Sequence, residues 1–168
     1  MAESAEFAND GITEEFFCLQ VKPGLDFSIE FDELFERYEA MADAESEIVL
    51  RLHLSDPANQ IPLIRARLAD RSSMVSCIGQ PPVNGSRVAL EAWHWRGPSV
   101  QKTKRPDGGL HVKLDHYQSL FYRLPHNPAA GSFDQMTYEF DQLEAAVKQY
   151  GGTLFDNLER TWIYCQDV

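Results

Sequence analysis

GGTLFDNLERTWIYCQDV, residues 151–168, decides the fold of this chain, because it ends one helix at its paired glycines and then restarts as a strand. A weaker version of the same pattern lies upstream. There, apolar residues at helical spacing over residues 29–41 lead into residues 47–56 (EIVLRLHLSD), whose leucines alternate with Arg51 and His53. This alternation predicts a strand with one buried face and places His53 on the opposite face. A strand-helix-strand unit is therefore used twice.

The remaining elements follow from periodicity, caps and turn residues. We expect further strands over residues 15–21, 74–79, 87–95, 100–104, 111–116 and 118–124. We expect helices over residues 29–41 with Ser28 as N-cap, over residues 57–68, and over residues 133–149 with a capping box of Ser132 and Gln135. Asn84-Gly85 predicts a hairpin turn before residues 87–95. Helices packed on one face of a mixed, mainly antiparallel sheet define the α+β class.

The composition is that of a globular protein. A chain of 168 residues with 43% hydrophobic residues can bury one substantial core or two small packed modules. Residues 1–14 are expected to be a disordered or extended N-terminus. The sequence has neither the run of about 18 apolar residues that spans a bilayer nor the basic and apolar regions of a signal peptide. We therefore expect no membrane partner and a cytoplasmic location.

The formal net charge of −11 limits the possible partners. Nucleic-acid affinity comes largely from Lys and Arg side chains that neutralise phosphates, so the charge argues against a nucleic-acid partner. Residues 96–113 are a local exception, with five of the fifteen Lys and Arg residues and one acidic residue. This segment could attract a small anion, or it could be a solvated hairpin whose charges discourage edge pairing.

The histidines and cysteines show none of the spacings typical of metal or nucleophile sites. The five histidines lack paired spacings, and zinc, calcium, phosphate-loop, dinucleotide and serine-hydrolase motifs are absent from the sequence. We expect no metal and no cofactor. Cys18, Cys77 and Cys165 have no CxxC spacing, and each sits in an apolar, strand-like segment. We expect all three to be reduced core residues.

Three stretches of the second half together carry a family resemblance: residues 117–124 (YQSLFYRL), the capped helix over residues 132–150, and residues 151–168. They are similar to the Rid (YjgF) superfamily, also called L-PSP endoribonuclease-like or translation initiation inhibitor-like. In that family a strand pair opening near a Tyr precedes a long helix, a Gly-x-Leu-x-Asp turn, and a strand that ends in a polar residue and Asp. The resemblance implies a Rid/YjgF-like, chorismate mutase-like α+β fold.

The first half looks like a related module. Pro81 and Glu91 fall where the family has a Pro and a Glu. The expected organisation is a first Rid-like module over residues 15–98 that lacks its opening strands, followed by the first half of a second module over residues 99–168. The arrangement also resembles the front portion of larger, two-module chorismatase-like relatives, so the chain could be a fragment of a longer protein.

The resemblance also implies a kind of ligand and a site. Family members resembling this chain are typically trimers with ligand clefts between subunits, and the better-known ones hydrolyse enamines and imines derived from amino acids. It therefore implies a small anionic metabolite as ligand, and self-association as a trimer or pseudo-trimer. The candidate catalytic residues are Arg71 as carboxylate ligand, Glu91, and Tyr117 as the cleft Tyr. From its place in the strand, between Leu90 and Ala92, Glu91 could be a half-buried acid with a raised pKa or a Glu on the exposed face. The position of the family's carboxylate-binding Arg holds Ser72, one residue after Arg71.

The sequence leaves several functions open. One is a cofactor-free enzyme on small carboxylated metabolites, either a deaminase-type enamine or imine hydrolase or a chorismatase-like hydrolase portion. A second is a non-catalytic small-molecule-binding or assembly module of the same fold, which the missing Arg favours slightly. A third is the L-PSP-type endoribonuclease activity attached to the family by name, against which the net charge argues.

Overall fold

The computed structural model describes residues 2–9, 11–24, 26–106, 108–123 and 131–161. The chain divides into two compact units, Met1–Phe121 and Tyr122–Val168, and each is described by itself. The division therefore falls later in the chain than the module boundary expected after residue 98. Within the described ranges, no helix combines the length and the hydrophobicity needed to cross a membrane.

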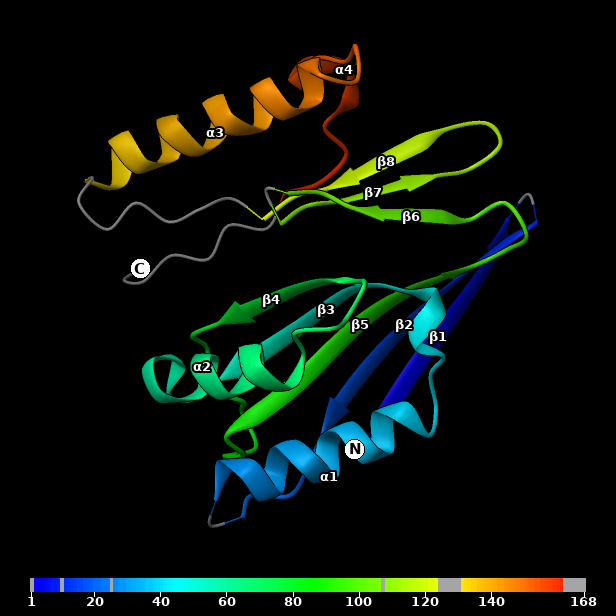
Figure 1. Cartoon of the computed structure of the whole chain (residues 1–168). Helices are drawn as coiled ribbons and strands as arrows, with labels where there is room; N and C mark the ends of the chain where they lie inside the picture. Colours follow the sequence, from blue (N-terminus) through cyan, green and yellow to red (C-terminus); the bar gives the residue numbers. More distant parts are fainter. Residues whose placement is uncertain (1, 10, 25, 107, 124–130, 162–168) are drawn as a thin grey trace. The chain divides into compact units, whose positions relative to one another are not determined.

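A five-stranded sheet forms the centre of the first unit (Figure 1). Its strands are β1 (Ala2–Asn9), β2 (Ile12–Gln20), β3 (Glu47–Leu54), β4 (Met74–Ile78) and β5 (Val88–Arg96), in the order β1-β2-β5-β3-β4. The β3–β4 pair is parallel, and the other pairs in this sheet are antiparallel. The predicted α+β class with a mixed, mainly antiparallel sheet is confirmed.

Two features of this sheet differ from the sequence-based expectation. The strand predicted over residues 15–21 is β2, but it pairs with a further antiparallel strand, β1, in the segment that was expected to be disordered or extended. Phe7 is the only large apolar side chain of β1, so backbone pairing with β2 defines this strand rather than hydrophobic alternation. The predicted hairpin between β4 and β5 is wrong as well, because β5 pairs with β2 and β3. Gly85, with φ of +83°, turns the connecting loop between β4 and β5.

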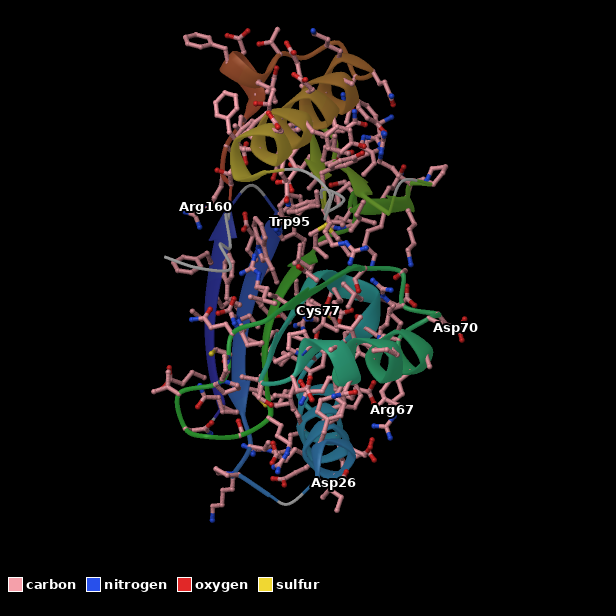
Figure 2. All side chains as sticks on the ribbon, turned by 90° about the vertical axis from the view of Figure 1, so that its left-hand side faces the viewer. Asp26, Arg67, Asp70, Cys77, Trp95 and Arg160 are labelled. Atoms are coloured by element: carbon pink, nitrogen blue, oxygen red, sulfur yellow. The ribbon has the colours of Figure 1, made fainter. Side chains whose placement is uncertain are left out.

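Two helices pack on one face of the sheet: α1 (Phe27–Glu39) and α2 (Pro57–Arg67). The expected apolar stripe of α1 is buried except for Met41, which follows the helix and is 42% exposed. The stripe joins the alternate leucines of β3 in the main core; the members of this core include Phe31, Leu34, Phe35, Tyr38, Leu50, Leu52 and Leu54. Asp26, labelled at the start of α1 in Figure 2, is the N-cap and accepts from the backbone N–H of Ser28 at 2.7 Å. The predicted N-cap, Ser28, therefore lies inside the first turn.

An antiparallel three-stranded sheet packs on the other face of the first sheet. Its strands are β6 (Gln101–Lys104), β7 (Leu110–Lys113) and β8 (Gln118–Phe121), and they form the predicted meander. A second core lies between the two sheets and contains Ile48, Val49, Trp95, Leu110, Val112 and Leu114. The same face of the first sheet continues to β1 and β2, where Phe7 and Phe16 are exposed to 63% and 38%.

The second unit contains α3 (Ser132–Lys148) and the short α4 (Leu154–Asn157). Gly131 is the N-cap of α3, so the predicted N-cap, Ser132, lies inside the helix and the predicted capping box is wrong. The predicted stop is confirmed, since Gly151, with φ of +78°, donates its N–H to the carbonyl of Lys148. Of the predicted strand over residues 160–167, residues 162–167 lie outside the described residues, and residues 160–161 are not in a strand.

Candidate functional site

The three predicted site residues occupy two sides of the central sheet. Arg71 follows α2 and lies on the helix side, with its guanidinium carbon 5.6 Å from the centre of the Phe35 ring. Glu91 lies on β5, next in sequence to Leu90 of the main core, so its side chain is on the opposite face. Tyr117, 48% exposed, precedes β8, and its ring centre is 6.3 Å from that of Trp95. Within one chain, the sheet separates Arg71 from Glu91.

Glu91 is instead part of a charged cluster with two residues of β3, Arg51 and His53. Arg51 is directly opposite Glu91 in the β3–β5 register, and His53 follows on the same face. The Arg51 Nη1 donates to Oε2 of Glu91 at 2.7 Å, and Nε2 of His53 lies 3.3 Å from Oε1. The Arg51 and His53 side chains are 15% and 16% exposed, while that of Glu91 is 44% exposed. We call these three residues the sheet-face cluster.

The electrostatics of the sheet-face cluster contradict the predicted acid. The His53 ring and the Arg51 guanidinium beside Glu91 lower the pKa of its carboxyl to about 2, although burial acts in the opposite direction. Glu91 is therefore ionised at neutral pH. The expectation of a raised pKa is wrong, because the sequence of β5 does not show that a guanidinium lies across from this carboxyl.

Cys18 and two aromatic side chains lie around the sheet-face cluster. Cys18 is opposite Glu91 in the β2–β5 register, and Phe16 stacks on Trp93 with ring centres 5.2 Å apart. Cys18 is a free cysteine that is exposed as a residue, and the partial desolvation of its thiol and the nearby Glu91 charge raise its pKa. The expected core position is therefore wrong for Cys18. Cys77 is half-buried against the main core, and Cys165 lies outside the described residues.

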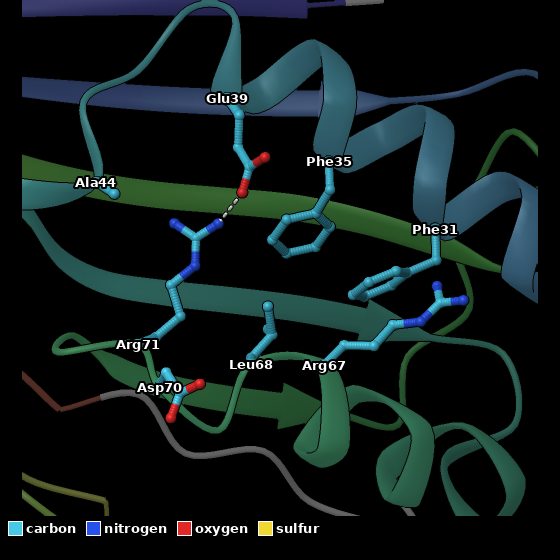
Figure 3. Close-up of a pocket in the computed structure, with 8 residues that line it drawn as sticks. All are labelled: Phe31, Phe35, Glu39, Ala44, Arg67, Leu68, Asp70 and Arg71. Carbon is cyan, nitrogen blue, oxygen red and sulfur yellow. Dashed lines mark hydrogen bonds and ion pairs between the residues drawn. The ribbon is translucent and has the colours of Figure 1, made fainter.

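The structure also contains a hollow of about 380 Å³ between α1 and the segment after α2, and Arg71 lines it (Figure 3). Arg67 lies over the Phe31 ring at 5.1 Å and pairs with Asp32 at 2.5 Å. Arg71 pairs with Glu39, as the dashed line in Figure 3 marks, and its Nη1 donates to Oε2 of Glu47 at 3.3 Å. Each arginine already has a carboxylate partner, so the hollow offers no net positive charge to an anion.

Three of the five Lys and Arg residues in the basic segment, residues 96–113, are likewise engaged. Arg96 pairs with Glu15 at 2.7 Å. The Lys102 ammonium donates to the backbone carbonyl of Glu47 at 3.0 Å, and that of Lys104 donates to the carbonyl of Arg71 at 3.0 Å. These cations fasten β6 and the end of β5 to neighbouring strands and loops. The structure therefore gives no support to a small-anion site on this segment.

Sequence reasoning missed the partners of Glu91. The leucine alternation in β3 already placed His53 away from the core, and the same alternation applies to Arg51. Only the β3–β5 register, which brings together residues 40 positions apart, shows that both side chains face Glu91. Among the described residues, no three His, Cys, Asp or Glu side chains form a group that could hold a metal ion.

Comparison of the chain with protein families, with curated proteins and with solved structures finds no match.

Proposed function

We propose that this chain is a Rid/YjgF-like protein that binds small, amino-acid-derived metabolites at the sheet-face cluster. The mixed, mainly antiparallel sheet with helices on one face agrees with the fold that the resemblance implies. The observation that carries the proposal is the Arg51–Glu91 pair, held in register on two paired strands. Sites built on strands position side chains more accurately than sites on loops.

The chemistry of the pair matches a molecule that carries both a carboxylate and a nitrogen. A guanidinium binds a carboxylate through two parallel N–H donors, and Arg51 supplies this group. Glu91, ionised at neutral pH, supplies the acceptor for an ammonium or iminium nitrogen. The guanidinium of Arg51 and the carboxylate of Glu91 are 2.7 Å apart. A ligand that binds to both of them in place of their ion pair must therefore carry a negative and a positive group close together. The α-carboxylate and α-nitrogen of an amino acid or imino acid meet this requirement.

Replacing the existing ion pair costs little. Glu91 is 44% exposed, and ion pairs with an exposed member contribute at most about 1 kcal/mol, because water competes for both charges. Cys18 and Phe16 lie beside Glu91 and offer a small polar and an aromatic surface to the rest of the ligand. In this proposal Arg51, on the strand next to β5, has the carboxylate-binding role that was expected of Arg71.

Binding is better supported than imine hydrolysis. General acid–base catalysis is most efficient when the pKa of the catalytic group lies near the working pH. With a pKa of about 2, Glu91 is a weak base and has no proton to give at pH 7. Its ionised state therefore favours the non-catalytic module over the deaminase-type enzyme.

The proposal includes self-association of the chain, as the family resemblance implies. Phe7 and Phe16 are exposed next to each other on the face that carries the cluster, with ring centres 6.1 Å apart. A second copy that packs there would cover both rings and enclose the ligand between subunits. Sedimentation velocity of the Phe7→Ser/Phe16→Ser variant should show a smaller species than the wild type; a monomeric wild type would refute the trimer.

Calorimetric titration tests the ligand proposal with three matched compounds: an α-amino acid, the corresponding α-keto acid and the corresponding amine. The wild type should bind the amino acid, and the Arg51→Gln and Glu91→Gln variants should each bind it at least tenfold more weakly. Arg37→Gln is the control, because Arg37 lies on α1 and pairs with Glu33 at 3.7 Å. Wild-type affinity in Arg51→Gln, or equal binding of all three compounds, would refute the proposal.

A second assay separates binding from hydrolysis. An amino-acid oxidase produces the imine, and a trapping reagent reports how much of it survives. The proposed binding module should leave the yield of trapped imine unchanged at catalytic protein concentrations. A yield that falls with time in proportion to the amount of protein would favour the hydrolase instead.

A further inference from the structure

A second polar cluster lies inside the first unit, between α1 and the sheet. Glu47 begins β3, is fully buried, and is opposite His94 of β5, which is also fully buried. The hydroxyl of Tyr38 from α1 lies between them, 2.5 Å from Oε2 of Glu47 and 2.6 Å from Nε2 of His94. Ser73 also donates its hydroxyl to Oε1 of Glu47. We call Tyr38, Glu47 and His94 the buried triad.

The contact between Nδ1 of His94 and Ser46 determines which ring nitrogen carries the proton. The Ser46 hydroxyl donates its single proton to the backbone carbonyl of Asp43 at 2.8 Å. Ser46 Oγ lies 2.9 Å from Nδ1 of His94, and it must therefore accept the proton that Nδ1 carries. In a neutral imidazole with a proton on Nδ1, Nε2 has none and can only accept a hydrogen bond.

The two contacts of Tyr38 then need one proton more than a neutral Tyr38, a neutral His94 and an ionised Glu47 supply together. A phenol has one proton, yet Tyr38 makes a contact of hydrogen-bond length with the carboxyl of Glu47 and with the imidazole of His94. If either contact lacked a proton, two lone pairs would face each other at 2.6 Å or less with no water to separate them. Buried acceptors without donors are costly, so both contacts require a proton.

We infer that the folded protein holds one proton in the buried triad beyond the phenolic proton of Tyr38 and the Nδ1 proton of His94. Burial raises the pKa of Tyr38, so the phenol keeps its own proton. Burial lowers the pKa of His94 to about 4, and the Arg96 charge adds to the effect. The lowered pKa keeps the His94 imidazole neutral. With Nε2 of His94 unprotonated, the phenolic proton of Tyr38 serves the contact with His94, and the additional proton lies between the Tyr38 oxygen and the Glu47 carboxyl.

The charges around the buried triad act in both directions. Arg71 at 3.3 Å favours an ionised Glu47, but its other nitrogen pairs with Glu39. The Tyr38 oxygen is closer to the same carboxyl oxygen, at 2.5 Å, and requires a proton there. The charged groups that act on the triad come from the elements packed against it: Glu39 on α1, Asp43 before β3, Arg71 before β4, Arg96 on β5 and Lys102 on β6.

The additional proton makes folding dependent on pH. Between about pH 7 and 8.5 a free Glu is ionised and a free Tyr is protonated. Apart from the proton of the neutral imidazole, the three side chains of the triad therefore carry one proton in the unfolded chain, on Tyr38. The folded triad carries two, so folding takes up one proton. Stability then decreases as pH rises, and the folding equilibrium constant falls about tenfold for each pH unit. The buried triad thereby acts as a pH-sensitive connection between α1, β3 and β5.

Urea denaturation of the wild type and of Glu47→Gln between about pH 7 and 8.5 tests this inference. The amide that this substitution introduces keeps a permanent N–H donor for Tyr38, so the variant should lose the roughly tenfold decrease per pH unit that the wild type shows. Glu30→Gln is the matched control. It also changes a buried carboxylate, but the described partners of Glu30 are N–H groups, so this variant should keep the wild-type slope.

A direct count of protons keeps the inference testable if Glu47→Gln does not fold. Refolding of the wild type by dilution from urea at about pH 7.5, in weak buffer with an indicator dye, should take up about one proton per chain. Uptake near zero, or a wild-type slope that persists unchanged in a folded Glu47→Gln variant, would overturn the inference.

Discussion

Glu30→Ala removes a buried carboxylate that connects α1 to the beginning of β5. Glu30 is 1% exposed, and its two oxygens accept from the backbone N–H of Gly24 at 2.7 Å and of Arg87 at 2.5 Å. The Arg87 guanidinium donates to the same carboxylate at 2.9 Å and to the Gly24 carbonyl at 2.6 Å. One side chain therefore holds the turn before α1, the helix itself and the loop before β5.

The magnitude follows from the contacts that are lost. A hydrogen bond to a charged acceptor contributes about 1.5 kcal/mol or more, and Glu30→Ala leaves two backbone donors without this acceptor. The guanidinium contact adds less, because the Arg87 side chain is 37% exposed. We expect a loss of about 3 kcal/mol in the free energy of unfolding, comparable to breaking other buried ion pairs.

The assay is urea denaturation followed by tryptophan fluorescence, which reports on Trp93 and Trp95 of the first unit. Glu33→Ala is the matched control, since Glu33 is also on α1, is 49% exposed and pairs with Arg37 at 3.7 Å. The control should change stability by less than about 0.5 kcal/mol. Equal losses in both variants, or a loss below about 1 kcal/mol in Glu30→Ala, would refute the reasoning.

Two further predictions concern the acid limb of stability and the loop before β5. The pKa of Glu91 falls from 4.5 to about 2 on folding, so its contribution is present above pH 4.5 and is lost as pH falls toward 2. Because Glu91 is 44% exposed, we expect its ionisation to contribute only about 1 kcal/mol to the free energy of unfolding. Glu91→Gln should therefore reduce the loss of stability between pH 4.5 and 2 by that amount. The same loss in the variant as in the wild type would contradict this prediction. Gly85→Ala should cost about 1–2 kcal/mol in the same denaturation assay, because Gly85 has φ of +83°; wild-type stability would show that the loop adjusts.

Periodic segments of this sequence predict their own structure well. The stripe of α1 and the alternation of β3 each bury one face against a common core, and the sequence contains both patterns in full. The stop at Gly151 is also local, since a positive φ favours Gly at that position. By contrast, β1 has few apolar residues, and its strand depends on pairing with β2, which a local pattern does not show.

The candidate site depends on strand order, which local patterns did not reveal. Asn84-Gly85 favours a hairpin, but the parallel β3–β4 pair places β3 between β4 and β5. That insertion brings Arg51 opposite Glu91 and moves Arg71 to the other face. The ionised state of Glu91 and the contacts of the buried triad follow from the same arrangement. Sequence reasoning singled out Glu91, but it missed the neighbours that determine the charge of this carboxyl.

The most direct test of the central claim is to map ligand contacts by two-dimensional ¹H–¹⁵N NMR during titration of the labelled wild type with an α-amino acid. We predict that the largest shifts fall on the amides of β3 and β5 around Arg51, His53 and Glu91, and that Arg51→Gln abolishes them. Shifts concentrated on Phe35 and Arg71, at the hollow between α1 and α2, would contradict the account, as would a spectrum that does not change.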